Sequence, residues 1–222
     1  MINSISFQVS SATFNKDPQS SELGLKILKD GIELMHALGF EAFTFRKLAQ
    51  KIKSTEASVY RYFESKHKLL LYYTCWYWAW KDYKLTLAVA NIDSPEQRLI
   101  KAIRLITQES KSDSALQLFD ADKLYQIVME ESSKTYLNKA VDDENKAGVF
   151  GTYKRIVETI AAIILEINSN YKYPHMLIST VIEGVHHERY FAVHLPRLTN
   201  TITGEDSVEC FFEQLVLNAI KK

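Results

Sequence analysis

The chain has 222 residues, enough for one large domain or two smaller ones with a sizeable core. Hydrophobic residues make up 46% and charged residues 24%, which excludes a largely disordered or collagen-like protein. Two cysteines, Cys75 and Cys210, cannot form a disulfide framework, so we expect a reducing, cytoplasmic location. The longest uncharged run of aromatic and aliphatic residues, 69–80, is far shorter than the roughly 20 residues of a membrane span, so we expect no membrane partner.

The formal net charge is zero, but the charges are unevenly distributed along the chain. Between Thr44 and Lys68 there are seven lysine and arginine residues and only two acidic residues. A basic patch on an otherwise neutral chain is typical of a nucleic-acid-binding module attached to a neutral body. A solvated helix surface gives the same pattern, so charge alone does not decide between the two interpretations.

The first part of the chain predicts an arm followed by a helix. Residues 1–19 are rich in Ser, Asn and Gln, and we assign this N-terminal arm no role. From Ser21 the apolar residues follow helical spacing up to Gly39, where we expect the helix to end. Gly31 lies on the apolar stripe of this helix and would let another helix approach closely.

Two short helices are predicted next. Thr44 is expected to be the N-cap of a helix over residues 45–52, and Thr55 the N-cap of a second helix over residues 56–63. Residues 53–54 form a tight turn between them. Two short helices joined in this way are a helix-turn-helix candidate.

A long helix is predicted from Lys66 to about Val89, and Pro95 is well placed to begin the next helix. Further helical segments are expected near residues 95–110, 114–139, 147–168, 174–195 and 205–221. Only seven glycines and four prolines occur, whereas all-β folds need frequent turn residues. We therefore predict an all-α fold without internal repeats.

The second helix of the pair has two chemically different faces. Val59 and Phe63 lie four residues apart and form an inward stripe, which can pack on Leu48 and Ile52 of the first helix. The outward side then carries Glu56, Ala57, Ser58, Tyr60 and Tyr62. Small side chains allow a close approach to base edges in a major groove, and tyrosine hydroxyls can reach phosphates. Thr55 and the helix N-terminus supply amide donors for a phosphate.

Two stretches in this region carry a family resemblance. They are Gly39-Phe40-x-Ala42-x-Thr44-x-Arg46-x-Leu48-Ala49 and Ser58-Val59-Tyr60-Arg61-Tyr62-Phe63-x-Ser65-Lys66-x-x-Leu69-Leu70. Together they resemble the N-terminal DNA-binding domain of TetR-family transcriptional regulators, over residues 23–71. The resemblance implies a three-helix DNA-binding domain, joined by a long fourth helix to an all-helical ligand-binding and dimerisation domain. We therefore divide the chain into the arm (1–19), a helix-turn-helix DNA-binding domain (20–70) and an effector-binding and dimerisation domain (71–222).

The resemblance also implies a function. The chain would be a repressor that binds double-stranded operator DNA as a homodimer, and an unidentified small-molecule effector, apolar or aromatic, would release it. No cofactor is implied. By the family pattern phosphate contacts come from hydroxyls and a lysine, and Arg46 is the side chain best able to reach a base. The predicted DNA-binding residues are Thr44, Arg46, Lys53, Thr55, Glu56, Ala57, Ser58, Tyr60, Tyr62 and Lys66.

The turn departs from the family pattern, which has Gly-Val-Ser where this chain has Lys53-Ser54-Thr55. Lys53 must adopt a conformation that glycine adopts without strain, at a cost of roughly 1 kcal/mol. A lysine there can compensate by meeting backbone phosphates. Glu56 would repel phosphates unless its carboxylate accepts a hydrogen bond from a cytosine amine.

The remaining predicted sites lie in the body of the protein. An effector pocket is predicted at Trp76, Phe119, Tyr125, Met129 and Tyr153. Aromatic residues around one helix also mark a core helix between two packed units, and this interpretation stays open. A dimer interface is predicted at Met176, Thr180, Glu183, Gly184, His187, Phe211, Phe212, Leu215, Val216 and Ala219.

Other functional classes are less well supported. No nucleophile elbow, glycine-rich phosphate loop or paired carboxylates occur, so we expect no enzymatic activity. Glu183, His187 and His194 share a helix face and have the chemistry to hold a metal, but a polar stripe at a helix-helix or dimer contact is the better explanation, and we predict no metal site. The main alternative is a TetR-like fold that carries a lipid or another hydrophobic ligand without binding DNA. A DNA-binding protein without an effector is a third possibility.

Overall fold

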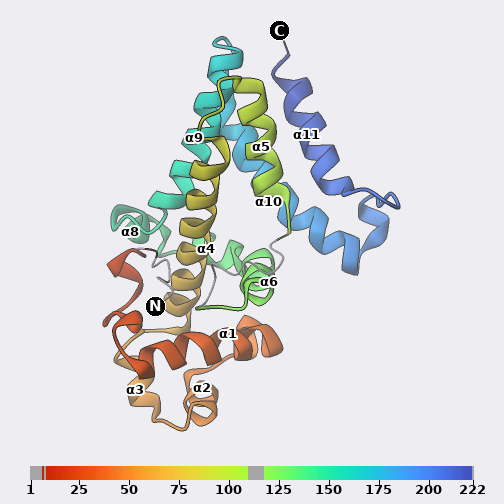
Figure 1. Ribbon diagram of the computed structural model, residues 1–222. Coiled ribbons are helices and arrows are strands. Elements are labelled where there is room, and N and C mark those ends of the chain that lie inside the picture. Colours follow the sequence, from red (N-terminus) through yellow and green to blue (C-terminus); the bar gives the residue numbers. More distant parts are fainter. Residues whose placement is uncertain (1–6, 8, 110–117, 222) are drawn as a thin grey trace. The chain divides into compact units, whose positions relative to one another are not determined.

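The structure, a computed structural model, describes residues 7, 9–109 and 118–221 (Figure 1). These residues contain helices and no strands, as predicted. The α-helices are α1 (Glu22–Ala42), α2 (Phe45–Lys51), α3 (Glu56–Tyr60), α4 (Lys66–Val89), α5 (Pro95–Thr107), α6 (Ala121–Glu131), α7 (Ser133–Tyr136), α8 (Val141–Lys146), α9 (Gly151–Ile167), α10 (Pro174–His194) and α11 (Ser207–Ala219). Short 3-10 helices are η1 (Ser11–Thr13), η2 (Pro18–Ser20) and η3 (Pro196–Leu198).

The middle of the chain differs from the predicted helix boundaries. The segment expected over 114–139 begins partly outside the described residues, and its helix α6 starts only after the N-cap Asp120. Helix α8 occupies a stretch where a break is predicted, at residues 142–145. Its acidic first turn has the composition of a polar loop, but carboxylates are also favourable at a helix N-terminus.

The described chain packs as two compact units. The first comprises the described parts of Met1–Ala79 and Ser110–Gly151, and the second those of Trp80–Glu109 and Thr152–Lys222. Helices α6 to α8 therefore pack with the predicted DNA-binding helices, and α4 contributes to both units. The functional division into residues 20–70 and 71–222 stays a prediction.

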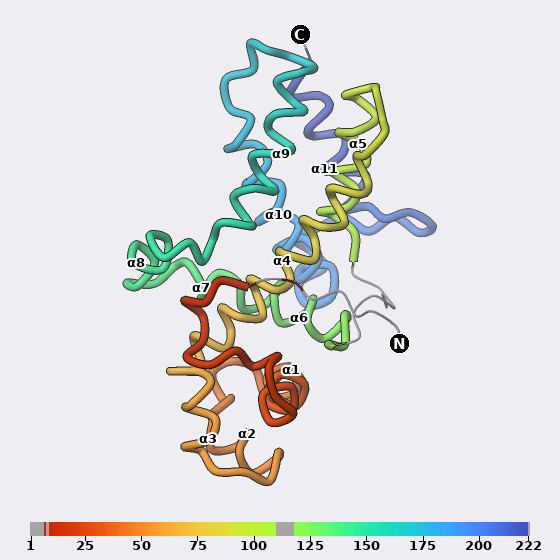
Figure 2. The backbone as a smooth tube through the Cα atoms, turned by 60° about the vertical axis from the view of Figure 1, so that its left-hand side comes forward, coloured from red at the N-terminus to blue at the C-terminus, as the bar shows by residue number. Residues whose placement is uncertain are grey.

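Within the first unit, α1 lies between α6 and the pair α2–α3 (Figure 2). The prediction that Gly31 permits a close approach is confirmed. A Cβ atom at this position would lie 2.4 Å from the hydroxyl of Tyr73 in α4. Because the space is free, that hydroxyl donates a hydrogen bond to the Leu28 carbonyl at 2.9 Å, deep in the core.

The end of α1 is broken at Gly39, where the sequence predicts that the helix stops. Gly39 has a φ of 73°, and the chain then resumes helical geometry up to Ala42. The Phe40 amide, left without a helical partner by the break, donates to the Glu131 carboxylate of α6 at 3.0 Å. Glu131 is almost fully buried, so α6 fixes the orientation of the segment that leads into α2.

The aromatic residues of α4 form a core, which favours the structural interpretation of this helix. Trp76 is 2% exposed, and its ring contacts Phe119 edge-to-face at 4.7 Å between centroids. Tyr72, Tyr73, Tyr77, Trp78 and Trp80 are also buried, whereas Tyr83 is exposed. The described part of the N-terminal arm belongs to the same core, because Phe7 packs edge-to-face on Trp76 at 5.0 Å.

In the second unit, two cations bind the C-terminal end of α5. The Lys81 ammonium donates to the Leu105 carbonyl at 2.9 Å, and the Arg189 guanidinium donates to the Thr107 carbonyl at 2.8 Å. These carbonyls have no partner within the helix, and cations are favoured at this end. Burial, with Lys84 and Arg189 nearby, lowers the pKa of Lys81 to about 7.

The same unit contains His186, a buried histidine in α10. Burial disfavours the imidazolium, and His187 and Lys81 repel it, so the pKa of His186 is lowered to about 3. The unfolded chain, with an ordinary histidine pKa of about 6.5, binds this proton more readily than the folded one. The contribution of His186 to the free energy of unfolding is therefore fully present above pH ~6.5 and is lost as the pH falls towards 3.

Replacing His186 by Gln should make the free energy of unfolding depend less on pH in acid solution. Between pH 6.5 and 3 the free energy of unfolding of the wild type should fall with an additional slope of up to about 1.4 kcal/mol per pH unit, absent from the variant. Urea unfolding at several pH values measures this difference. His175→Gln on the exposed part of α10 is the matched control, and identical profiles for wild type and His186→Gln would contradict the assignment.

Candidate nucleic-acid interface

The helix-turn-helix is formed by α2 and α3, and both predicted N-caps are confirmed. The Thr44 hydroxyl accepts a hydrogen bond from the Lys47 amide at 3.2 Å. The Thr55 hydroxyl accepts one from the Ser58 amide at 3.2 Å. Each threonine thus satisfies an amide that the start of the helix leaves free. Both threonines are exposed, so these two helix starts face solvent.

The inward face of the motif is also as predicted. Val59 and Phe63 have no exposed surface, and Leu48 of α2 is equally buried. Ile52, at the end of α2, is 3% exposed. Since these side chains fix α3 from behind, its other side must face away from the protein.

The turn shows the backbone strain expected from the sequence. Lys53 has a φ of 55°, in the left-handed region that favours glycine. The turn is closed by the Ser54 amide, which donates to the Ala49 carbonyl at 2.9 Å. The Lys53 side chain is exposed, so its charge points to solvent beside the start of α3.

The outward face contains most of the predicted DNA-binding residues. Tyr60 is 48% exposed, and its ring packs edge-on against Phe45 at 5.0 Å, which holds the hydroxyl at the surface. Ser58 is half-buried, and its hydroxyl is hydrogen-bonded to that of Thr55 at 2.8 Å. The exposed members are Thr44, Arg46, Lys53, Thr55, Glu56, Ala57 and Tyr60.

The expectation that Tyr62 lies on the outward face is wrong. Helix α3 ends at Tyr60, earlier than the sequence pattern predicts, and Tyr62 turns towards the N-terminal arm. Its side chain is 4% exposed, and its hydroxyl shares a hydrogen bond with Ser21 at 2.8 Å. That hydrogen bond, with help from Lys16 and Arg61, lowers the pKa of Tyr62.

Lys66 has a structural role that sequence reasoning missed. Its ammonium donates to the carbonyls of Phe40 and Glu41 at 2.9 and 3.1 Å, and lies 4.5 Å from the centre of the Phe40 ring. It therefore caps the end of α1 just before the motif begins. No local pattern in the sequence marks this contact across 25 residues. The predicted phosphate contact of Lys66 is not tested by this geometry.

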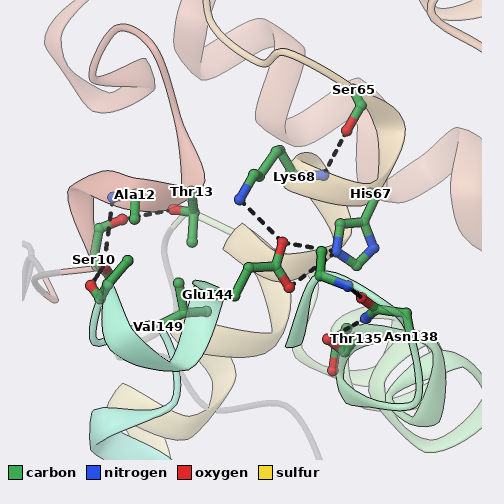
Figure 3. Close-up of polar contacts among 12 residues, drawn as sticks. Ser10, Ala12, Thr13, Ser65, His67, Lys68, Thr135, Asn138, Glu144 and Val149 are labelled. Atoms are coloured by element: carbon green, nitrogen blue, oxygen red, sulfur yellow. Dashed lines mark hydrogen bonds and ion pairs between the residues drawn. The ribbon is translucent and has the colours of Figure 1, made fainter. Parts of the chain in front are cut away.

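A buried carboxylate in α8 holds the first turn of α4 (Figure 3). Glu144 is 4% exposed and lies 3.0 Å from both the His67 Nε2 atom and the Lys68 ammonium. Ser65 caps the same turn by accepting from the Lys68 amide at 3.2 Å. The helix that comes after α3 is thus anchored to α8, and the charge of Lys68 is directed inward.

These contacts reduce the number of positive charges available to a ligand. Lys66 and Lys68 are occupied as described, Lys47 donates to the Ala42 carbonyl at 2.8 Å, and Lys51 lies 3.8 Å from Asp30. Of the seven cations between residues 44 and 68, the exposed ones without an ion pair or side-chain hydrogen bond to the described residues are Arg46, Lys53 and Arg61. Arg46 and Lys53 belong to the predicted set, whereas Arg61 belongs only to the basic patch.

The predicted effector-pocket residues are divided between the two units. Trp76 and Phe119 pack on each other in the first unit, and Tyr125 lies there 6.5 Å from Tyr77 between ring centroids. Met129 is half-buried in α6. Tyr153 belongs to the second unit, where its hydroxyl donates to Glu183 at 3.0 Å. The pocket assignment stays a prediction.

A groove of about 550 Å³ occurs elsewhere, in the second unit, between the end of α10 and the start of α11. None of the predicted pocket residues contributes to it. Its lining combines apolar and polar side chains: Glu188, Leu198, Thr199, Asn200, Ile202, Glu205, Ser207, Val208, Cys210, Phe211 and Gln214.

Part of the predicted dimer interface is buried inside the protomer. Phe212 is 4% exposed and Val216 is fully buried, so the expectation that these two form an intermolecular surface is wrong. Gly184 admits the Phe212 ring, because a Cβ there would lie 2.7 Å from it. The small residue thus brings α10 and α11 together within one chain. Glu183 is half-buried, and the exposed members of the set are Met176, Thr180, His187, Phe211, Leu215 and Ala219.

The described residues contain no group of three metal-binding side chains, and Glu183 is instead hydrogen-bonded to Tyr153. His187 stacks on Phe191 and His194 lies against Tyr190. Within the same residues no helix is both long and apolar enough to cross a membrane.

Comparison with known proteins identifies the class of this domain. Residues 27–73 match the profile of bacterial regulatory proteins of the tetR family. The N-terminal part of the chain is therefore a TetR-family helix-turn-helix domain, and the chain has the fold of a TetR-family regulator rather than that of an enzyme. A search of curated proteins found no significant match.

Solved structures support this fold over nearly the whole chain. The superantigen PfiT matches with a TM-score of 0.57 and 15% identity, covering 91% of this chain and 97% of its own. The ketosteroid transcriptional regulator KstR2 of Mycobacterium tuberculosis gives 0.52 and 14%, covering 90% and 94%. AibR, solved with isovaleryl coenzyme A and operator DNA, gives 0.51 and 14%, covering 86% and 94%.

The left-handed turn makes a stability prediction. Lys53→Gly should raise the free energy of unfolding by up to about 1 kcal/mol, because glycine adopts a positive φ without the clash of a Cβ atom. The same change should weaken DNA binding by removing a charge. Urea unfolding measures the first effect and fluorescence anisotropy the second.

Lys53→Ala is the control, since it removes the charge but keeps the Cβ atom. It should weaken DNA binding equally without any gain in stability. A gain in stability for alanine equal to that for glycine would show that the backbone conformation is not the cause.

Proposed function

We propose that the chain is a transcriptional regulator that binds operator DNA through the outward face of α2 and α3. The observation that carries this proposal is the composition of that face. Three cations without a partner among the described residues, an exposed tyrosine and two exposed helix N-caps lie around a short helix that is fixed from behind by Val59 and Phe63. Cations and hydroxyls bind phosphates, and the small side chains of Ala57 and Ser58 permit a close approach to bases.

Individual roles are proposed from chemistry and position. Arg46 is exposed on α2 and can make a bidentate hydrogen bond to guanine in the major groove. Lys53 and Tyr60 are suited to phosphates, as is Thr44 at the start of α2. Glu56 is exposed at the start of α3, where its carboxylate can accept from a cytosine amine. Tyr62, which is buried, is left out of the contact surface.

The active form is proposed to be a homodimer. One five-residue helix contacts few base pairs, and a twofold dimer doubles the contact surface. The exposed apolar residues Met176, Phe211 and Leu215 on α10 and α11 are suited to a partner, being 65%, 55% and 37% exposed. In such a dimer the two α3 helices would lie roughly 34–36 Å apart, in successive major grooves.

The regulator is proposed to respond to a small molecule. One protein of similar fold, AibR, was solved with isovaleryl coenzyme A and operator DNA, and another, KstR2, is described as a ketosteroid transcriptional regulator. An effector acts only by its different affinity for the DNA-binding and the released conformation. Isothermal calorimetry with apolar and aromatic ligands tests this, and heat without any change in DNA affinity would contradict an effector role.

The alternative of a carrier that no longer binds DNA is not favoured. A carrier has no need for exposed Arg46 and Lys53, unpaired among the described residues, beside an exposed Tyr60. The fold alone does not decide, since one protein of similar fold is described as a superantigen.

Arg46→Ala should relax base preference at one position of the operator. Because the variant cannot form the bidentate hydrogen bond to a base, affinity for the preferred duplex should fall by about 1–3 kcal/mol, whereas substituted duplexes should bind nearly as before. Fluorescence anisotropy measures these affinities with a duplex from upstream of the coding sequence and with duplexes in which single positions are changed. Lys47→Ala is the control, because the Lys47 ammonium is bonded to the protein itself.

A uniform loss of affinity on all duplexes would instead place Arg46 on a phosphate. An unchanged affinity for every duplex would remove Arg46 from the interface.

A further inference from the structure

The described part of the N-terminal arm packs along the first unit. Phe7 packs on Trp76, and Val9 and Ala12 pack against a small buried cluster. That cluster consists of Leu71, Cys75 and Val149. The arm then passes through η1 and reaches the end of α3 at Asn15. Its path is thus determined by the core, although its composition indicates only a polar extension.

Asn15 binds the backbone at the end of the DNA-binding helix. Its amide donates to the Tyr62 carbonyl at 2.7 Å, and its side-chain nitrogen donates to the Tyr60 carbonyl at 3.2 Å. The last carbonyls of any helix lack partners within the helix, and in a five-residue helix they are a large share of the total. Asn15 supplies one of these partners, at Tyr60, from a segment 45 residues away, and its backbone amide binds the chain two residues beyond the helix.

Lys16 of the arm and Ser21, the N-cap of α1, both contact Tyr62. Ser21 is hydrogen-bonded to the Tyr62 hydroxyl at 2.8 Å, and the Lys16 ammonium lies 5.2 Å from the centre of the Tyr62 ring. Lys16 and Arg61 are both exposed. Both favour the ionised form of Tyr62 and lower its pKa, after the larger effect of Ser21.

We propose that the arm is a further part of the DNA-binding surface, in which Asn15 positions the end of α3 and Lys16, together with Arg61, binds a backbone phosphate of the DNA. This inference rests on the proposed function. Arg61 directly follows α3 and Lys16 lies over the ring of Tyr62, so two exposed cations lie at the end of this helix, where Tyr62 is buried and Lys66 and Lys68 are bonded to the protein. Phosphate is the anion that duplex DNA presents beside any helix in its major groove.

The phosphate contact is tested by the salt dependence of binding. Fluorescence anisotropy would use a labelled duplex from upstream of the coding sequence and a duplex of unrelated sequence and equal length. Lys16→Met keeps an unbranched side chain over Tyr62 but removes the charge. The slope of log K against log salt should become shallower by about 0.9 on both duplexes. Lys16→Arg should restore the wild-type slope.

The matched control is Lys146→Met on α8, which removes an exposed charge from the same unit. Its slope should equal that of the wild type. An unchanged slope for Lys16→Met, or an equal change for the control, would overturn the phosphate contact.

The positioning role of Asn15 has a readout that needs no DNA. In Asn15→Ala, amide hydrogen exchange over residues 58–63 should accelerate, while exchange in α10 stays unchanged. Affinity should fall several-fold on both duplexes with the wild-type salt slope, since no charge is removed. The affinity of Asn15→Asp for both duplexes should fall further, because a carboxylate would face the Tyr60 carbonyl. Unchanged exchange in Asn15→Ala would overturn the positioning role.

The DNA-binding function and the role of the arm can fail separately. If the wild type binds neither duplex at low ionic strength, the proposed function and the arm's role in DNA binding fail together. If the wild type binds and Lys16→Met and Asn15→Ala behave like it, only the inference about the arm fails.

Discussion

The burial of Val59 and Phe63 is the constraint on which the DNA-binding face depends. Both side chains are fully enclosed, so α3 has only one orientation in which its apolar atoms avoid water. Five residues cannot form a stable helix by themselves, because nucleation is unfavourable and few hydrogen bonds offset it. The orientation and the existence of α3 therefore both come from packing, supported by the Thr55 cap at one end and Asn15 at the other.

Two buried carboxylates connect this motif to the helices packed behind it in the first unit. Glu131 of α6 binds the broken end of α1 at Phe40, and Glu144 of α8 binds the first turn of α4 at His67 and Lys68. Removing one partner of a buried charge leaves the other unpaired, which is costly. The helices immediately before and after α2–α3 thus each depend on a residue far away in the sequence.

Local features of the site could be predicted from the sequence, and features that depend on distant contacts could not. The Thr44 and Thr55 caps, the inward stripe and the strained Lys53 depend on neighbours a few residues away. The prediction for Tyr62 is wrong because α3 ends at Tyr60, and Tyr62 is buried with its hydroxyl hydrogen-bonded to Ser21. In the same way, α8 has the composition of a polar loop, and only the tertiary structure shows that its Glu144 is buried.

The charge pattern illustrates the same limit. A count of basic residues indicates a patch, but Lys66 caps α1, Lys68 pairs with Glu144, and Lys47 binds a backbone carbonyl. Fewer positive charges therefore remain available at the surface than the composition suggests. At the other end of the chain, Phe212 and Val216 have the spacing of an interface, but an apolar stripe packs equally well within a protomer.

Hydroxyl-radical footprinting of the protein with and without duplex DNA tests the central claim most directly. Tyr60 on α3 and Tyr173 before α10 have comparable exposure, 48% and 59%. If the outward face of α3 binds DNA, the duplex should protect Tyr60 from oxidation and leave Tyr173 unchanged. Bound DNA that leaves Tyr60 fully reactive would contradict the assignment of this face.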